Sequence, residues 1–138
     1  MKSYIVDTNV LISFVTDRNL LQQEKAAPLF ENASRGSCRL LFHQQVLTEF
    51  VYVLDRVYGV KLGTIKSMLG ALLNFPGASL INEADFIQVM SVWPEKVGDL
   101  TDAILLCNVK VLKKPILATF DTRLAKEAKK LGANIYGF

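Results

Sequence analysis

The stretch Tyr4-Ile5-Val6-Asp7-Thr8-Asn9-Val10-Leu11 decides the fold that this sequence predicts. Its first three residues are of the aromatic and β-branched kinds that favour strands, and the run stops at a carboxylate. Residues 10–15 continue as an apolar segment, which we interpret as a helix. A strand that ends in an acidic side chain is of interest in α/β proteins, because their functional crevice lies beyond the carboxyl ends of the strands.

Beyond this stretch, predicted helices alternate with predicted strands. The clearest helix is 44–58, whose apolar residues recur at steps of three and four. These are Val46, Leu47, Phe50, Val53, Leu54 and Val57. The other expected helices are 23–33, 62–74, 83–93, 101–112 and 122–131, and the expected strands are 39–42, 79–81, 116–120 and 135–136. Alternation of this kind predicts a three-layer α/β/α fold around a central, mainly parallel sheet of about four to five strands.

Length and composition predict one domain over residues 1–138. The chain has 138 residues, 51% of them hydrophobic, and it contains no repeat or linker. No apolar run approaches the roughly 18 residues of a membrane span, and Asp7 interrupts the place where a signal peptide would be apolar. Cys38 and Cys107 form no CxxC or Cys/His cluster, which argues against a zinc site or a disulfide scaffold. We therefore expect a soluble protein of the reducing cytoplasm.

The basic residues allow two interpretations. The net charge is only +3, but lysines and arginines cluster in two places late in the chain. They could form solvated helix faces, or a rim that faces phosphates if an acidic metal site lies nearby. On the second interpretation the candidate substrate contacts are Lys110, Lys113, Lys114, Arg123 and Lys126, with Lys129 and Lys130 in the same cluster as the last two.

Two carboxylates follow predicted strands directly. Asp7 follows the first strand and Asp121 follows strand 116–120. If these strands are neighbours, both side chains emerge at the same rim of the sheet. Each residue also has an ordinary interpretation, since Asp is a favoured helix N-cap.

The remaining candidate acids lie on helices. Glu49 is at the margin of the apolar stripe of helix 44–58, and Asp55 lies at the opposite margin, so periodicity does not choose between them. Asp99 and Asp102 precede or begin an apolar helix, where Asp99 or Thr101 could cap and Asp102 could favour the helix dipole. Alternatively, Asp102 points to the same rim as Asp7.

A group of acids at one rim would need a cation. Four carboxylates repel one another, and burying them without partners is costly. Mg²⁺ prefers oxygen ligands, takes one or two carboxylates directly and keeps several waters, so further acids can orient those waters. A phosphate oxygen can join the coordination sphere, and a metal-activated water is the expected nucleophile.

The order of these acids resembles that of PIN domains. Asp7-Thr8-Asn9-Val10-Leu11 is similar to the family's opening motif, and Glu49 stands in a helix as in its second motif. Asp102-Ala103-Ile104-Leu105 is similar to the third motif and Thr119-Phe120-Asp121 to the fourth. The resemblance runs from residue 4 to about residue 136.

The resemblance implies an Mg²⁺-dependent endoribonuclease, in which Mn²⁺ can replace Mg²⁺. It makes Asp7, Glu49, Asp102 and Asp121 the catalytic acids, with Asp7 and Asp102 on the metal and the other two direct or through water. Thr8, Asn9 and Thr119 become accessory residues that hydrogen-bond the carboxylates or a phosphate, and Asp99 is either a further acid or only a cap. In-line attack would leave a 5′-phosphate and a 3′-hydroxyl. A single small PIN domain is similar to the VapC toxins of toxin–antitoxin pairs, which implies a homodimer, an RNA substrate and a small cognate antitoxin.

The sequence allows three other interpretations: a histidine general base, a phosphatase and a non-catalytic module. His43 precedes the Glu49 helix, and we interpret it as structural and not as a general base. A haloacid-dehalogenase-like phosphatase also begins with a strand ending in Asp, but its second Asp, two residues on, is Asn9 here. A non-catalytic PIN-like module that binds RNA or protein would be expected to lose acids, and this chain keeps all four.

Overall fold

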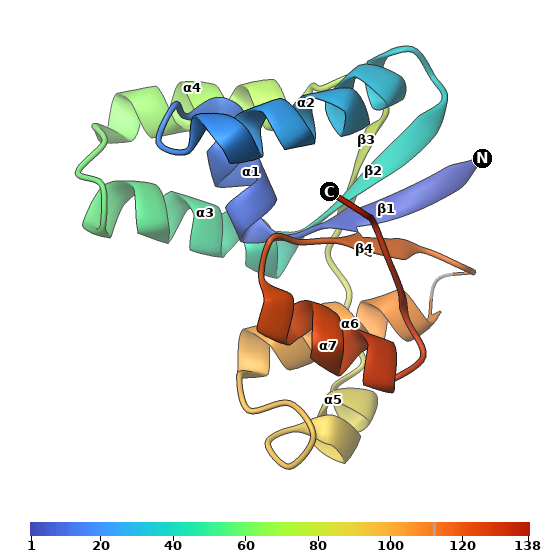
Figure 1. Cartoon of the computed structure of the whole chain (residues 1–138). Coiled ribbons are helices and arrows are strands. Elements are labelled where there is room, and N and C mark those ends of the chain that lie inside the picture. Colours follow the sequence, from blue (N-terminus) through green and yellow to red (C-terminus); the bar gives the residue numbers. More distant parts are fainter. Residues whose placement is uncertain (112) are drawn as a thin grey trace.

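The centre of the molecule is a parallel sheet that collects strands from almost the whole chain (Figure 1). The computed structural model describes residues 1–111 and 113–138, and of residues 110 and 111 it describes the backbone alone. The strand order is β3-β2-β1-β4-β5, and every neighbouring pair is parallel. The strands are β1 (Lys2–Val6), β2 (Cys38–His43), β3 (Ala78–Ile81), β4 (Ile116–Ala118) and β5 (Asn134–Ile135).

Helices cover both faces of this sheet. Figure 1 shows α1 to α4 on one side and α5 to α7 on the other. The helices are α1 (Thr8–Val15), α2 (Leu20–Ser34), α3 (Gln44–Arg56), α4 (Leu62–Leu73), α5 (Phe86–Val92), α6 (Leu100–Val111) and α7 (Thr122–Lys130). The predicted three-layer α/β/α fold is confirmed, and the sheet has five strands in the described part of the chain.

Burial follows from this layering. Ile5 and Val6 in the central strand β1 are completely buried, because each face of the strand carries a layer of helices. On α3 most of the predicted stripe is also buried, with Phe50 and Leu54 at 0% exposure, and Val53 is half-buried. Val57 departs from that prediction: it is 62% exposed, because α3 ends at Arg56 and the chain turns away.

Two element boundaries differ from the sequence prediction because side chains cap the backbone there. The helix expected from residue 83 begins at Phe86, since the Asp85 carboxylate accepts hydrogen bonds from the first turn. The strand expected to reach residue 120 ends at Ala118. Beyond it, the Phe120 N–H donates to the Asn9 side chain instead of to a neighbouring strand. The shortened strand is the first sign that this edge of the sheet is built around polar side chains.

Candidate active site

Asp7 lies where the two central strands end. Strands β1 and β4 are parallel neighbours, with Val6 opposite Ala118, so their carboxyl ends meet at one edge of the sheet. The Asp7 backbone N–H donates to the Ala118 carbonyl at 2.9 Å, which extends the pairing by one residue. The Asp7 side chain is only 8% exposed. The condition that the sequence left open, that the two acidic strand ends be neighbours, is therefore met.

The Asp7 carboxylate is held by three uncharged donors. Thr8 donates its backbone N–H to Oδ1 at 2.8 Å, and Thr119 donates its hydroxyl to Oδ2 at 2.7 Å. The Asn9 amide also donates to Oδ2, at 3.2 Å. Among the described residues, no lysine or arginine forms an ion pair with Asp7. Its orientation is thus fixed while its charge is left without a cation.

Asn9 and Thr119 fasten the segment after β4 to the same carboxylate. The Asn9 side-chain oxygen accepts the Phe120 N–H at 3.1 Å, and the Thr119 hydroxyl oxygen accepts the Asp121 N–H at 3.0 Å. The Asn9 amide also lies 3.4 Å from the Thr119 hydroxyl. These bonds place Asp121 at the edge where Asp7 emerges.

Asp121 is both a helix cap and a member of this edge. Its Oδ1 accepts the backbone N–H groups of Arg123 and Leu124, at 2.9 and 3.1 Å, and so begins α7. Among the described residues, no hydrogen bond reaches its Oδ2. The capping interpretation and the site interpretation therefore do not compete, because one oxygen serves each.

Glu49 reaches the edge from α3. Its Oε2 accepts the Thr8 hydroxyl at 3.0 Å, and Thr8 is the residue whose backbone binds Asp7. Asp55, the alternative acid of the same helix, lies near its far end and pairs with its neighbour Arg56 at 3.3 Å. Of the two acids that periodicity could not separate, the structure links Glu49 to Asp7.

Asp99 and Asp102 have different roles. The exposed Asp99 is the N-cap of α6: its side chain accepts the Asp102 N–H at 3.0 Å and its carbonyl accepts the Ala103 N–H. Asp102, in the first turn, has a side chain only 16% exposed and pairs with Arg123 at 3.0 Å. Asp102 also interacts electrostatically with Asp7 and Asp121, so it is the acid of this pair that lies near their edge of the sheet, and Asp99 ends the loop before it.

Two of these acids have raised pKa values. Burial raises the pKa of Asp7 to about 6; the hydrogen bonds from Thr119 and Thr8 oppose the rise, and Glu49 and Asp121 add to it. Burial also raises the pKa of Asp102 to about 7, helped by the charges of Asp99, Asp7 and Asp121 and opposed by Arg123. Each shift shows a carboxylate whose negative charge is incompletely balanced.

The donor set at this edge fits a hard divalent cation. All four acids offer oxygen, with no sulfur or imidazole among them, as Mg²⁺ and Mn²⁺ prefer. Within the described residues, no three acidic, histidine or cysteine side chains are gathered closely enough to enclose an ion. Mg²⁺ commonly takes only one or two carboxylates directly and keeps several waters, so an Mg²⁺ site does not need such a cage.

The basic residues that could form a phosphate-facing rim lie at opposite ends of strand β4. Arg123 lies at the site, paired with Asp102 and, at 3.7 Å, with Glu127. Lys126 is exposed one turn further along α7. Lys113 and Lys114 are exposed before the amino end of β4, so the strand, roughly 10 Å long, separates them from the acidic edge. The Lys110 side chain lies outside the described residues.

His43 and the cysteines have structural surroundings. The His43 ring caps α3, with Nδ1 accepting the Gln45 N–H at 3.0 Å and Nε2 lying 3.1 Å from the Glu83 carbonyl. Burial lowers its pKa. Cys38 and Cys107 are buried and form no disulfide. These observations agree with the interpretation of His43 as structural.

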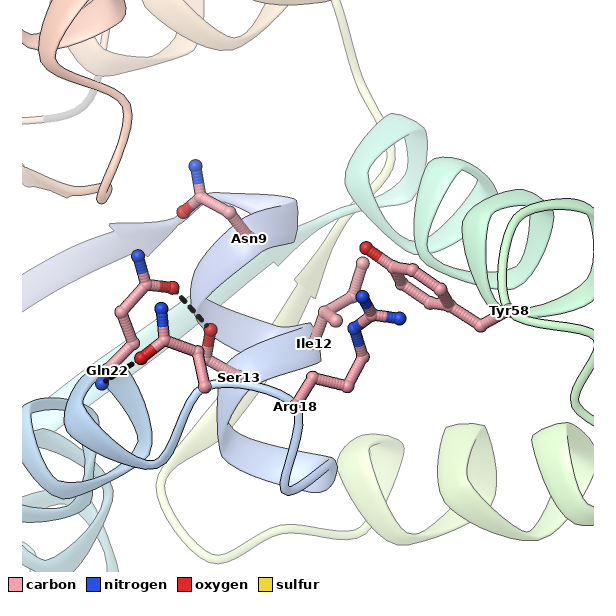
Figure 2. A pocket seen from close by; sticks show the side chains of 7 residues that line it. Asn9, Ile12, Ser13, Arg18, Gln22 and Tyr58 are labelled. Carbon is pink, nitrogen blue, oxygen red and sulfur yellow. Dashed lines mark hydrogen bonds between the residues drawn. The ribbon is translucent and has the colours of Figure 1, made fainter.

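A cleft beside Asn9 was not foreseen from the sequence. It is lined by residues of α1, of the loop before α2, of the start of α2 and by Tyr58 (Figure 2). The lining residues are Asn9, Ile12, Ser13, Arg18, Asn19, Gln22 and Tyr58. Apart from Asn9, none belongs to a recognisable motif, and Arg18 stands alone in a short loop outside both basic clusters.

Comparison with known proteins agrees with this geometry. The model of the PIN domain family matches residues 4–130. The chain therefore belongs to the PIN domain family, whose members have a nuclease-type fold, are generally nucleases and typically use divalent metals. No curated protein matches the chain significantly. Among the described residues, no helix is both long and apolar enough to cross a membrane.

Proposed function

We propose that this protein is an Mg²⁺-dependent endoribonuclease that hydrolyses RNA phosphodiester bonds. The observation that carries the proposal is the position of Asp7. Its carboxylate is buried and oriented by three donors, and it interacts electrostatically with Glu49, Asp102 and Asp121. Such an arrangement is costly without a cation, and it lies where parallel α/β sheets bind their ligands.

The proposed role of each acid follows from its contacts in the structure. Asp7 and Asp102 would hold the ion, while Glu49 and Asp121 bind it directly or orient its waters. Thr119 and Asn9 keep the Asp7 carboxylate in place, and Thr8 does the same for Glu49. A bound Mg²⁺ polarises the phosphodiester and lowers the pKa of a water. Mn²⁺ would serve with the same oxygen ligands.

The products follow from attack by water in line with the bond that breaks. A water oxygen forms a bond to phosphorus as the bond to the ribose 3′ oxygen breaks, and the 3′ oxygen gains a proton. The products are a 5′-phosphate and a 3′-hydroxyl. His43, the single histidine of the sequence, caps a helix and does not serve as the base.

Cleavage of labelled structured RNAs, with Mg²⁺ and with EDTA, tests the proposal. We expect wild-type cleavage to require the metal, and Asp7→Asn and Asp121→Asn to abolish it while circular dichroism shows an intact fold. Asp55→Asn, at the exposed end of α3, is the matched control and should cleave normally. Full activity in Asp7→Asn would remove the metal-site proposal, and activity that persists in EDTA would point to a contaminating ribonuclease.

The resemblance to VapC toxins supports a finer proposal. We propose that residues 1–138 form a single PIN domain that acts in the cytoplasm as a homodimer and is neutralised by a small antitoxin protein. Cys38 and Cys107 are buried and not joined in a disulfide, which fits that reducing compartment. Induced expression should arrest growth with the wild type but not with Asp7→Asn, and light scattering should give twice the monomer mass. Unimpaired growth with an active enzyme would contradict the toxin role.

A further inference from the structure

The cleft beside Asn9 is of the size of a nucleoside site. Its volume is about 290 Å³, near the lower end for small-molecule sites, and it is open on one side (Figure 2). Ile12 provides an apolar patch on its wall, and the remaining lining side chains carry amide, hydroxyl or guanidinium groups. A wall with one apolar patch and several hydrogen-bonding groups suits a flat, polar ring system.

Arg18, packed on the ring of Tyr58, provides a flat guanidinium surface in this cleft. The Arg18 guanidinium carbon lies 3.1 Å from the centre of the Tyr58 ring, so the cation is packed on the ring face. Figure 2 shows the two side chains together on one side of the cleft. Unpaired RNA bases stack on aromatic rings and on guanidinium planes, and arginine adds a charge that attracts the neighbouring phosphate.

The amides opposite this surface are held in fixed orientations. The Ser13 hydroxyl donates to Gln22 Oε1 at 2.8 Å, and Asn19 Oδ1 accepts the Gln22 backbone N–H at 3.0 Å. Each bond occupies the amide oxygen. Among the described residues, no protein acceptor takes the N–H groups of either amide, so they remain donors for the carbonyl or ring-nitrogen edge of a base.

Asn9 connects this cleft to the acidic edge. Its side chain lines the cleft and also donates to Asp7 Oδ2 at 3.2 Å, so one residue separates the two. We propose that the cleft is a subsite for one unpaired nucleoside of the RNA, next to the phosphate that is cleaved, with its base stacked on the face of the Arg18 guanidinium that is turned away from Tyr58 and its edge bound by Gln22. This inference rests on the proposed ribonuclease function and deepens it.

Binding measured without cleavage tests the subsite. A labelled single-stranded RNA hexamer is titrated into the wild-type protein in EDTA, and into Arg18→Ala, Arg18→Lys and Gln22→Ala. We expect Arg18→Ala to weaken binding about tenfold, as loss of one stacked base would. Arg18→Lys should keep the salt dependence of binding, because it keeps the charge. It should nevertheless weaken binding almost as much as Arg18→Ala does, because lysine has no plane to stack. Gln22→Ala should change the preference among hexamers of different base.

The control is Arg35→Ala. Arg35 is exposed at the carboxyl end of α2, where the chain leads into the amino end of β2, so it carries the same charge at the end of the sheet away from the acidic edge. If Arg18→Ala and Gln22→Ala bind and cleave as the wild type does, the subsite is wrong and the ribonuclease proposal stands. If Arg18→Ala weakens binding but the wild type never cleaves, the subsite stands and the ribonuclease proposal fails. Equal affinity of Arg18→Lys and wild type would overturn the stacking role.

Discussion

Asp7 and Asp102 both have raised pKa values, yet the molecule holds them in opposite ways. Asp7 is buried between two strand ends and oriented by uncharged donors, of which Thr119 is the closest. Asp102 lies on the first turn of a helix and is paired with Arg123, whose side chain is 58% exposed. The difference indicates that Asp7 is a fixed anchor for a metal ion. Asp102, in contrast, can exchange its partner Arg123. A cation, or a phosphate that draws Arg123 away, can change the surroundings of Asp102 without moving the backbone.

The largest effect is expected when the anchor loses its charge. Asp7→Asn should lower the rate of RNA cleavage on the order of a thousandfold, because several kcal/mol of metal stabilisation are lost. Single-turnover kinetics at saturating RNA measure this without interference from product release. A loss under tenfold would show that Asp7 is not the anchor.

The next effect is a dependence of stability on pH. The pKa of Asp7 is about 6 in the folded protein, above its unfolded value of 3.8, so its contribution to stability is fully present below pH 3.8 and is lost as the pH rises through 6. The loss is on the order of 3 kcal/mol for this buried group. Asp102, with a pKa of about 7, changes in the same direction over a range that extends higher.

Urea unfolding in EDTA between pH 4 and 8 measures this dependence. The free energy of unfolding should fall with rising pH in the wild type and fall less in Asp7→Asn. Saturating Mg²⁺ should raise the free energy most at the upper end of the range, because it binds the ionised carboxylates. A flat profile in EDTA would contradict the view that these charges are unbalanced.

A smaller effect is expected when Asp7 keeps its charge but loses one of the hydrogen bonds that orient it. Thr119→Ala removes a hydroxyl that donates to a buried carboxylate, so we expect a stability loss of about 1.5–3 kcal/mol near pH 8. Cleavage should fall by about 10–100-fold. Thr119→Ser keeps the hydroxyl and serves as the control. If the two variants behave alike, the hydrogen bond to Asp7 is not what matters.

The smallest effect on stability is expected from the loss of Arg123, the partner of Asp102. Arg123→Ala removes an ion pair whose basic member is largely exposed, so the free energy of unfolding should change by less than about 1 kcal/mol. The comparison with Thr119→Ala is direct, since each variant removes one partner from one of the two acids. A loss from Arg123→Ala as large as that from Thr119→Ala would mean that Asp102 is held as firmly as Asp7.

The strand-end acids could be predicted because they depend on local signals. A β-branched run followed by Asp7, and an apolar strand followed by Asp121, need only the parallel rule to meet at one edge. Glu49 could not be separated from Asp55 by periodicity, since the deciding bond from Thr8 joins residues 41 positions apart. That choice required the family resemblance.

Other parts of the site depend on contacts that a sequence does not display. Charge alone assigns the separate clusters of Lys113, Lys114 and of Arg123 to one possible rim, although a strand lies between them, because charge takes no account of strand direction. The sequence gives no sign of a role for Arg18, because its partner Tyr58 is 40 positions away and neither lies in a motif. Strand 116–120 was predicted two residues too long because Asn9, from the other end of the chain, binds the backbone there.

The measurement that tests the central claim most directly is a calorimetric titration of the metal-free protein with Mg²⁺ at pH 7, repeated with Mn²⁺. The wild type and the control Asp55→Asn should bind the ion and release protons, since Asp7 and Asp102, with pKa values of about 6 and 7, are partly protonated at that pH. Asp7→Asn should show no binding in the same range. Equal binding by Asp7→Asn and the wild type, or none by either, would contradict a metal site anchored on Asp7.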